Sequence, residues 1–81
     1  MKIAKQTAEE LVAKLLGDKT NAGFEVKNGI VIGCIWMEGQ WVEVPLPYEE
    51  LVLTKAVELG LLEKRIVTVG NGSERELYAL K

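Results

Sequence analysis

The chain has 81 residues, a formal net charge of −2, 48% hydrophobic residues, one cysteine and no histidine. The length is that of one small domain, and we expect residues 1–81 to form a single domain. The lack of histidine excludes zinc fingers with histidine ligands, histidine triads and cysteine–histidine dyads. The negative charge removes the general attraction to phosphate on which most nucleic-acid-binding proteins depend.

The sequence gives no sign of export or of membrane insertion. Its longest apolar run, residues 30–37, has the length of a strand and is far shorter than the ~20 residues of a membrane-spanning helix. The first residues, MKIAKQTAEEL, lack the apolar core of a signal peptide. One cysteine permits no internal disulfide. We therefore expect a cytoplasmic protein without a membrane partner.

The first predicted element is a helix over residues 7–17, TAEELVAKLLG. Thr7 and Glu10 have the spacing of a capping box, and Gly17 is suited to end the helix. Apolar residues recur at helical spacing over residues 8–16 and form one stripe. This helix is expected to turn that stripe toward a core.

Residues 24–44 predict three strands joined as a meander. Asn28 and Gly29 are suited to the left-handed backbone of a two-residue type I′ turn. The run at 30–36 is apolar at both alternating sets of positions, which indicates a central strand covered on both faces. A second turn is expected within MEGQ, residues 37–40.

A second helix is predicted for residues 47–59, PYEELVLTKAVEL. Pro47 fits the first turn of a helix, where its missing N–H is harmless, and Gly60 is suited to follow the last turn. Two strands, RIVTV at 65–69 and RELYAL at 75–80, come after it. The order is α-β-β-β-α-β-β, so we predict an α+β fold with two helices and a mostly antiparallel sheet.

The register of the last two strands is predicted from their apolar residues. A two-residue loop at Asn71 and Gly72 would set valines opposite glutamates. Pairing Val69 with Leu77 instead aligns apolar side chains and leaves GNGSERE, residues 70–76, as a seven-residue loop. We therefore expect an exposed loop there.

No residue pattern in the chain specifies a reaction. Cys34 lies within an apolar strand, where a thiol packs as a small hydrophobic side chain. The glycine-rich GNGS stands between two strands and lacks the helix that a phosphate-binding loop requires. Adjacent glutamates at the starts of both predicted helices are explained by the helix dipole. We expect a protein that is no enzyme and has neither cofactor nor metal.

An acidic, tryptophan-containing surface is the predicted binding site. Trp36 and Trp41 face each other if Glu38 and Gly39 form the turn between their strands, because cross-strand partners share a face. Tryptophan and tyrosine dominate interface hot spots, and the surrounding carboxylates favour a basic protein partner. The predicted partner-binding residues are Trp36, Glu38, Trp41, Glu43, Tyr48, Glu49 and Glu50.

Other interpretations of these residues stay open. If one helix covers each face of the sheet, both tryptophans belong to the core. A small core also favours self-association, as a homodimer, through an apolar helix face or an open sheet edge. By analogy, small acidic domains of this kind include inhibitors of host machinery from phages and mobile elements.

The second half of the chain, residues 49–81, resembles the recognition helix and wing of winged-helix transcription regulators. The likeness consists of AVELGLLEKR, an Asn-Gly turn and RELYAL. This resemblance implies a DNA-binding regulator, whose helix enters the major groove while the wing meets the backbone. The nucleic-acid contacts it implies are Lys64, Arg65, Asn71 and Arg75.

Overall fold

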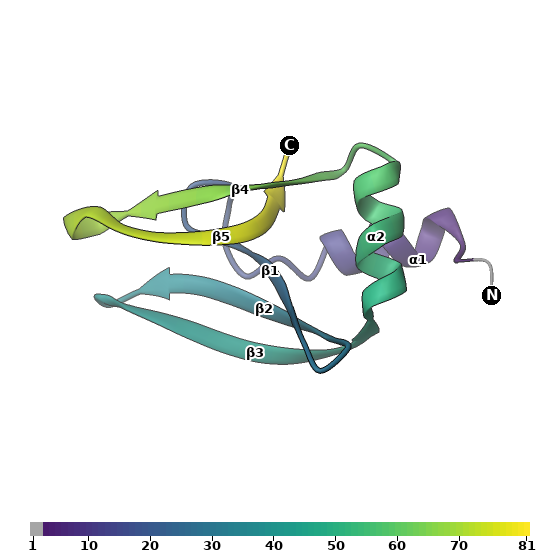
Figure 1. Cartoon of the computed structure of the whole chain (residues 1–81), viewed down its shortest axis with the longest axis horizontal. Helices are drawn as coiled ribbons and strands as arrows, with labels where there is room; N and C mark the ends of the chain where they lie inside the picture. The colour runs from purple at the N-terminus through teal and green to yellow at the C-terminus, as the bar shows by residue number, and fades with distance from the viewer. Residues whose placement is uncertain (1–2) are drawn as a thin grey trace.

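Two helices and five strands make up the fold of residues 3–81, which are the residues that the structure, a computed structural model, describes (Figure 1). The order α-β-β-β-α-β-β is confirmed. In chain order the elements are α1 (Lys5–Val12), β1 (Ala22–Lys27), β2 (Ile30–Met37), β3 (Gln40–Glu49), α2 (Glu50–Glu58), β4 (Leu62–Val69), the short 3-10 helix η1 (Gly70–Gly72) and β5 (Ser73–Leu80).

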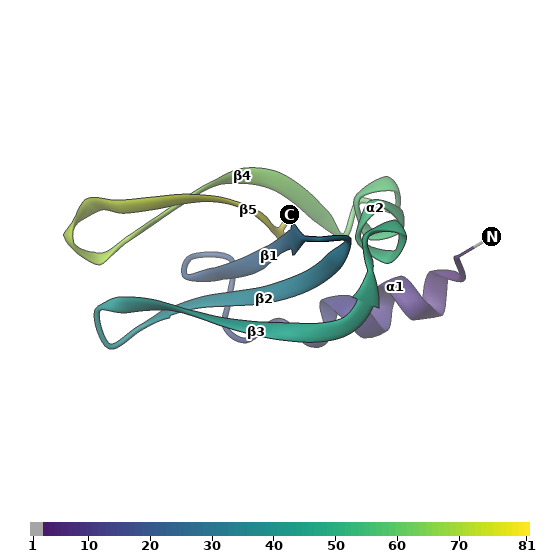
Figure 2. The ribbon, with the colours of Figure 1, turned by 60° about the horizontal axis from the view of Figure 1, so that its bottom comes forward.

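The strands form one antiparallel sheet in the order β3-β2-β1-β5-β4, which confirms the α+β class. The short strand β1 lies at the centre, with the hairpin β2–β3 on one side and the hairpin β4–β5 on the other. Figures 1 and 2 show the helices together at one end of the molecule and both hairpins extending toward the other. Residues 36–41 and 69–74, the tips of the two hairpins, are called the hairpin end below.

Both turns of the meander are as predicted. Asn28 and Gly29 have φ values of 53° and 78°, and Glu38 and Gly39 have φ values of 53° and 77°. Two consecutive left-handed residues define the type I′ turn, whose twist matches that of the flanking strands. The second turn sets Trp36 opposite Trp41.

Helix α1 is shorter than predicted and begins earlier. It runs over Lys5–Val12 behind Ala4, whose side chain cannot cap it, so Thr7 lies inside the helix instead of starting it. From Lys14 on, the amides bond three residues back, with Lys14 N–H donating to the carbonyl oxygen of Leu11 at 2.9 Å. Such bonds tighten and end a helix. The predicted capping box at Thr7 and the predicted end of the helix at Gly17 were therefore wrong.

The boundary between β3 and α2 also differs from the prediction. Strand β3 continues through Pro45 and Pro47 to Glu49, and α2 begins at Glu50. Because β3 is an edge strand, one row of its backbone groups has no partner, and proline is tolerated there. The end of the helix is as expected, since Gly60 follows it with a φ of 76°.

The main core lies where both helices pack on the same side of the sheet. The helices also pack against each other, so the alternative in which each helix covers a different face does not hold. Half-buried side chains, Tyr48 among them, surround this core. Its fully packed members are Ala8, Leu11, Phe24, Val31, Val52, Leu53, Ala56 and Leu62.

A second, smaller core lies on the other face of the sheet and contains no helix residue. Its buried members are Ile32, Cys34, Val67, Leu77 and Ala79, with Trp41 and Val69 packed against them. Val67 belongs to β4 and Cys34 to β2, although β1 and β5 separate these strands in the sheet. The sheet therefore curls so that its two hairpins close over this core. Strand β2 is apolar on both faces, as predicted, because each face lies on one core.

The register of β4 and β5 is neither of the two that the sequence suggested. Val69 pairs with Ser73, and only the three residues of η1 form the loop, with Asn71 and Gly72 at φ values of 58° and 82°. The predicted seven-residue loop was wrong. The valines of β4 need no apolar residue directly opposite them on β5, because they belong to a core that also includes Ile32 and Cys34 of β2.

Candidate functional site

The seven predicted partner-binding residues lie in two places. Trp36, Glu38, Trp41 and Glu43 belong to the β2–β3 hairpin, toward the hairpin end. The other three lie where β3 meets α2: Tyr48 packs against the main core, Glu49 precedes α2 and Glu50 is its first residue. The structure thus brings the first four together and separates them from the rest.

Trp36 and Trp41 are neither fully core nor fully surface. Their ring centroids are 5.6 Å apart with an angle of 71° between the planes, the edge-to-face arrangement that aromatic rings favour. Both are half-buried, and Trp41 packs against the second core. A β-carbon built on Gly70 would lie 3.7 Å from Nε1 of Trp36, so the two hairpin tips nearly touch. The pair forms a small aromatic cluster at the hairpin end.

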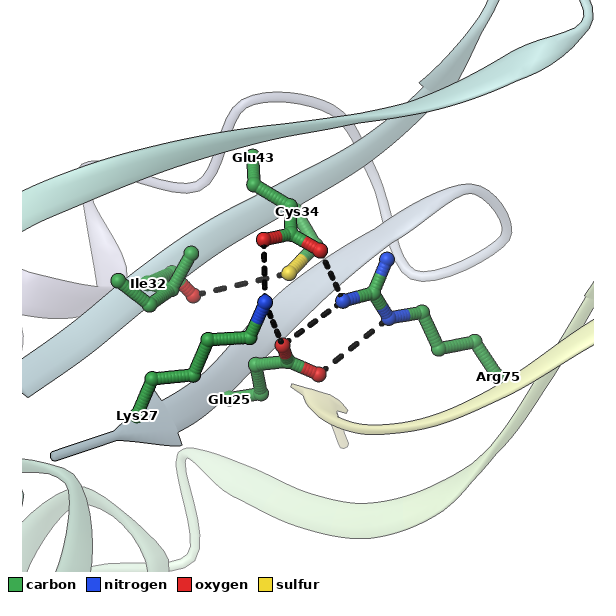
Figure 3. A network of polar contacts seen from close by, with 6 residues as sticks. All are labelled: Glu25, Lys27, Ile32, Cys34, Glu43 and Arg75. Carbon is green, nitrogen blue, oxygen red and sulfur yellow. Dashed lines mark hydrogen bonds and ion pairs between the residues drawn. The ribbon is translucent and has the colours of Figure 1, made fainter.

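Next to the tryptophans lies a network of four charged side chains from three strands (Figure 3). Nζ of Lys27 lies 2.6 Å from Oε1 of Glu43 and 3.5 Å from Oε1 of Glu25. Arg75 donates to both oxygens of Glu25, with Nη2 at 2.7 Å and Nε at 3.3 Å, and Nη2 also donates to Glu43. With two acids and two bases, the network is formally neutral.

Arg75 connects strands that are not neighbours in the sheet. Its side chain reaches from β5 past β1 and β2 to Glu43 on β3. The guanidinium carbon also lies 5.4 Å from the centre of the Trp41 ring, within the range of a cation–π contact. Arg75 therefore braces the two hairpins across the curled face and joins the charge network to the tryptophan pair.

The network changes the pKa values of Glu43, Lys27 and Arg75. Hydrogen bonds from Lys27 and then Arg75 lower the pKa of Glu43 to about 2. The hydrogen bond to Glu43 raises the pKa of Lys27. Partial burial works to lower the pKa of Arg75, but hydrogen bonds to Glu43 and Glu25 outweigh it and raise that pKa. Glu43, Lys27 and Arg75 are therefore charged at neutral pH.

Replacing Glu43 by glutamine is expected to make the stability of the protein less dependent on pH. The folded-state pKa of Glu43 is below its ordinary value of 4.5, so its stabilising effect is complete above that pH and is lost as the pH falls toward 2. Urea denaturation from neutral pH to about pH 3 should show a steeper loss for the wild type than for Glu43→Gln. Glu76→Gln, which removes an exposed carboxylate, should follow the wild-type curve. Parallel curves for wild type and Glu43→Gln would contradict this role.

Cys34 lies under the network, within the second core. It is buried, its Sγ is 3.8 Å from the carbonyl oxygen of Ile32, and burial raises the pKa of its thiol to about 11. A thiol of this kind is protonated at neutral pH and packs as a small apolar group. Among residues 3–81, no group of three or more histidine, cysteine, aspartate and glutamate side chains is arranged to hold a metal ion.

The residues implied by the winged-helix resemblance have other contacts within the molecule. Lys64 lies 3.5 Å from Glu76 and over the ring of Tyr78. Arg65 donates to the carbonyl oxygen of Lys19. These two residues follow each other in β4, so their side chains point to opposite faces of the sheet.

The other two implied residues lie in the β4–β5 hairpin. Asn71 occupies the left-handed position of the loop, where its Oδ1 accepts a hydrogen bond from Oγ of Ser73 at 2.8 Å. Arg75 belongs to the charge network described above. The hairpin itself is integrated into the sheet through the pairing of Tyr78 with Phe24.

Sequence reasoning missed Glu25 and Lys27 as members of the site. Their i, i+2 spacing on β1 puts them on one face of the strand, and this signal was available. Their partner Arg75 is 50 residues away from Glu25 in the sequence, and no local pattern indicates that pairing. Glu43 was predicted as an acidic residue of the partner-binding surface, whereas the structure shows its charge balanced by two bases, Lys27 and Arg75.

Comparison with known proteins gave no match: no protein-family model, no curated protein and no solved structure matches the chain. No helix within the described residues 3–81 is long and apolar enough to cross a membrane. The function has to be inferred from the geometry of the site itself.

Proposed function

We propose that this chain is a non-enzymatic binding protein that acts by occupying a basic surface of a partner protein with its hairpin end. The observation that carries the proposal is the edge-to-face pair of Trp36 and Trp41, half-buried at the tips and far from the helices. Beside it, Met37 is 46% exposed. Aromatic and methionine side chains are enriched at the centres of protein interfaces.

The charge of the hairpin end supports a basic partner. Glu38 and Glu74 are exposed there, and residues 36–41 and 69–74 contain neither lysine nor arginine. The nearest bases, Lys27 and Arg75, are balanced by the carboxylates of the network. A negatively charged surface steers a basic partner protein toward the tryptophans and disfavours acidic partner proteins.

The contacts that Arg75 makes between the two hairpins also support the proposal, because they reduce the conformational entropy lost on binding. Hairpin tips that are free to move lose conformational entropy when a partner orders them. Here Arg75 ties β5 to β3, and Trp41 packs on the second core, so the two tips are held before binding. A preordered surface loses less free energy on association.

Binding to a partner should depend on Trp36 and on Glu38. With the protein immobilised in an extract of its source organism, Trp36→Ala should weaken capture of its partner by about 30-fold, the effect of a hot-spot residue. Glu38→Lys should also weaken it. The matched control Glu58→Lys reverses an exposed charge on α2, far from the hairpin end, and should capture normally. Thermal melts must show that each variant is folded.

The result that would refute the proposal is equal capture by wild type, Trp36→Ala and Glu38→Lys. The winged-helix interpretation, a DNA-binding regulator, is tested in the same preparation with duplex DNA at low and moderate salt. Tight and steeply salt-dependent binding would support that alternative. We favour the protein-binding function because Lys64, Arg65 and Arg75 already contact carboxylates or backbone oxygens of the same chain.

A further inference from the structure

We propose a second binding surface, the free edge of β4, which takes up an extended segment of a partner protein as an additional strand. The segment that fits alternates acidic with apolar side chains. Apart from Val69, the last residue of β4, none of the residues involved belongs to the hairpin end, so each proposal can be tested without the other.

The two edges of the sheet are not equivalent. Strand β3 carries Pro45 and Pro47, and its pairing with β2 shifts register between Ile30 and Ile32. Prolines and bulges are the usual means of protecting an edge against further strands. Strand β4 has eight residues, no proline and an unbroken register with β5 from Leu62 to Val69. Every second residue of such an edge turns its N–H and C=O groups outward, and these groups can pair with an added strand.

A depression of about 480 Å³ lies along β4 and is lined in part by the segment before β1. The charged side chains that line it are Lys19, Arg65, Lys81 and Glu63; Glu63 lies 3.8 Å from Arg65, which leaves two unbalanced basic side chains, Lys19 and Lys81. On a chain with a net charge of −2, this is a local excess of positive charge. Charge complementarity therefore selects an occupant that carries carboxylates.

The alternation of side chains along β4 defines the pattern of the occupant. Arg65 and Val67 point to the curled face, where Lys19 lies, while the depression follows the strand edge and is lined from both faces. Ile66 and Thr68 point to the opposite face, and Ile66, at 56%, is the most exposed large hydrophobic residue described. An added strand would thus place acidic side chains on the curled face, toward Lys19, and apolar ones beside Ile66.

A second copy of the chain does not meet these requirements. Two β4 strands paired antiparallel around a two-fold axis would bring their basic depressions side by side, with Lys19 and Arg65 of both copies on the same face. The basic side chains of the two copies would repel one another, and β4 itself offers one carboxylate, Glu63, in place of an alternating acidic pattern. The occupant we infer is therefore an acidic, extended segment of another protein.

A peptide titration followed by NMR tests the inference. The probe is a capped eight-residue peptide that alternates glutamate with valine or threonine, added to the isotope-labelled protein. We expect the backbone amide signals of residues 63–69 to shift and the exchange of the outward amides of β4 to slow. Lys19→Glu should weaken binding at least tenfold, whereas Lys5→Glu, an exposed charge reversal on α1, should leave it unchanged.

Two further peptides separate strand addition from charge attraction. A peptide that alternates lysine with valine should not bind. An acidic peptide with alternate amides N-methylated keeps its charges but cannot pair its backbone, and it should lose the binding. Equal binding of the methylated peptide, or no shift of residues 63–69 at millimolar acidic peptide, would overturn the proposal. So would a dimer, in the absence of peptide, whose β4 amides are already protected.

Discussion

Gly23→Ala is expected to lower the free energy of unfolding by about 3 kcal/mol, the upper end of the range for an overpacked core. Gly23 is buried in β1, beside β5. A β-carbon there would lie 2.7 Å from Cβ of Leu77 and 2.9 Å from the carbonyl oxygen of Tyr78. Neither atom is the end of a flexible side chain, and β5 is held on its other side by β4. The added methyl group must therefore push β1 and β5 apart.

Gly33→Ala provides the matched comparison, since Gly33 is also a buried strand glycine. Its β-carbon would lie 3.5 Å from Cδ1 of Leu46 and 3.6 Å from Cδ1 of Leu16, at ordinary contact distance. This change should stabilise the protein by about 0.5 kcal/mol, because alanine has less freedom in the unfolded chain. Urea denaturation of both variants gives the two values. Similar effects of the two substitutions on the free energy of unfolding would show that the close approach of β1 to β5 leaves room for a β-carbon at residue 23.

Arg75→Ala is expected to cost about 2 kcal/mol of unfolding free energy, in the range for hydrogen bonds to charged groups. The variant leaves Glu25 and Glu43 with Lys27 as their remaining base, and it removes the contact to Trp41. The side chain of Arg75 is 20% exposed, so solvent screens these interactions only in part. Loss of the contacts of Arg75 between the hairpins should also make the tryptophan side chains more accessible to acrylamide, which quenches their fluorescence.

Lys64→Ala is the control for a surface ion pair. Lys64 lies 3.5 Å from Glu76, with the two side chains 54% and 61% exposed. Exposed pairs of this kind contribute about 0.5 kcal/mol or less. Urea denaturation and acrylamide quenching of both variants should therefore separate Arg75 from Lys64. Equal and small effects would mean that Arg75 is an ordinary surface residue and that the hairpins do not need it.

Features that depend on neighbouring residues were predictable from the sequence. The turns at Asn28 and Glu38 follow from two residues with left-handed backbone, and the second of them correctly set Trp36 against Trp41. Position within the sheet is not local, and there the predictions failed. Pro47 was interpreted as a helix start because nothing in its surroundings indicates that β3 is an edge strand.

The candidate site was predictable only in its aromatic part. The tryptophan pair comes from one hairpin, whereas the network combines β1, β3 and β5. The curling of the sheet creates these contacts, and it also explains the wrong register of β4 with β5. The prediction aligned the apolar side chains of β4 and β5 with each other, but Val67 and Val69 belong to a core that also takes in β2 and Trp41 of β3.

The central position of β1 has a consequence for the order of folding. Strand β1 lies early in the sequence, but one of its two neighbours in the sheet is β5, the last strand. Glu25 of β1 and Arg75 of β5 are separated by 50 residues. The entropy of closing a loop of that length must be lost before the contact can form. The meander and the β4–β5 hairpin can each assemble locally, and joining them is the slow, non-local step. During synthesis, the sheet therefore stays incomplete until β5 has left the ribosome.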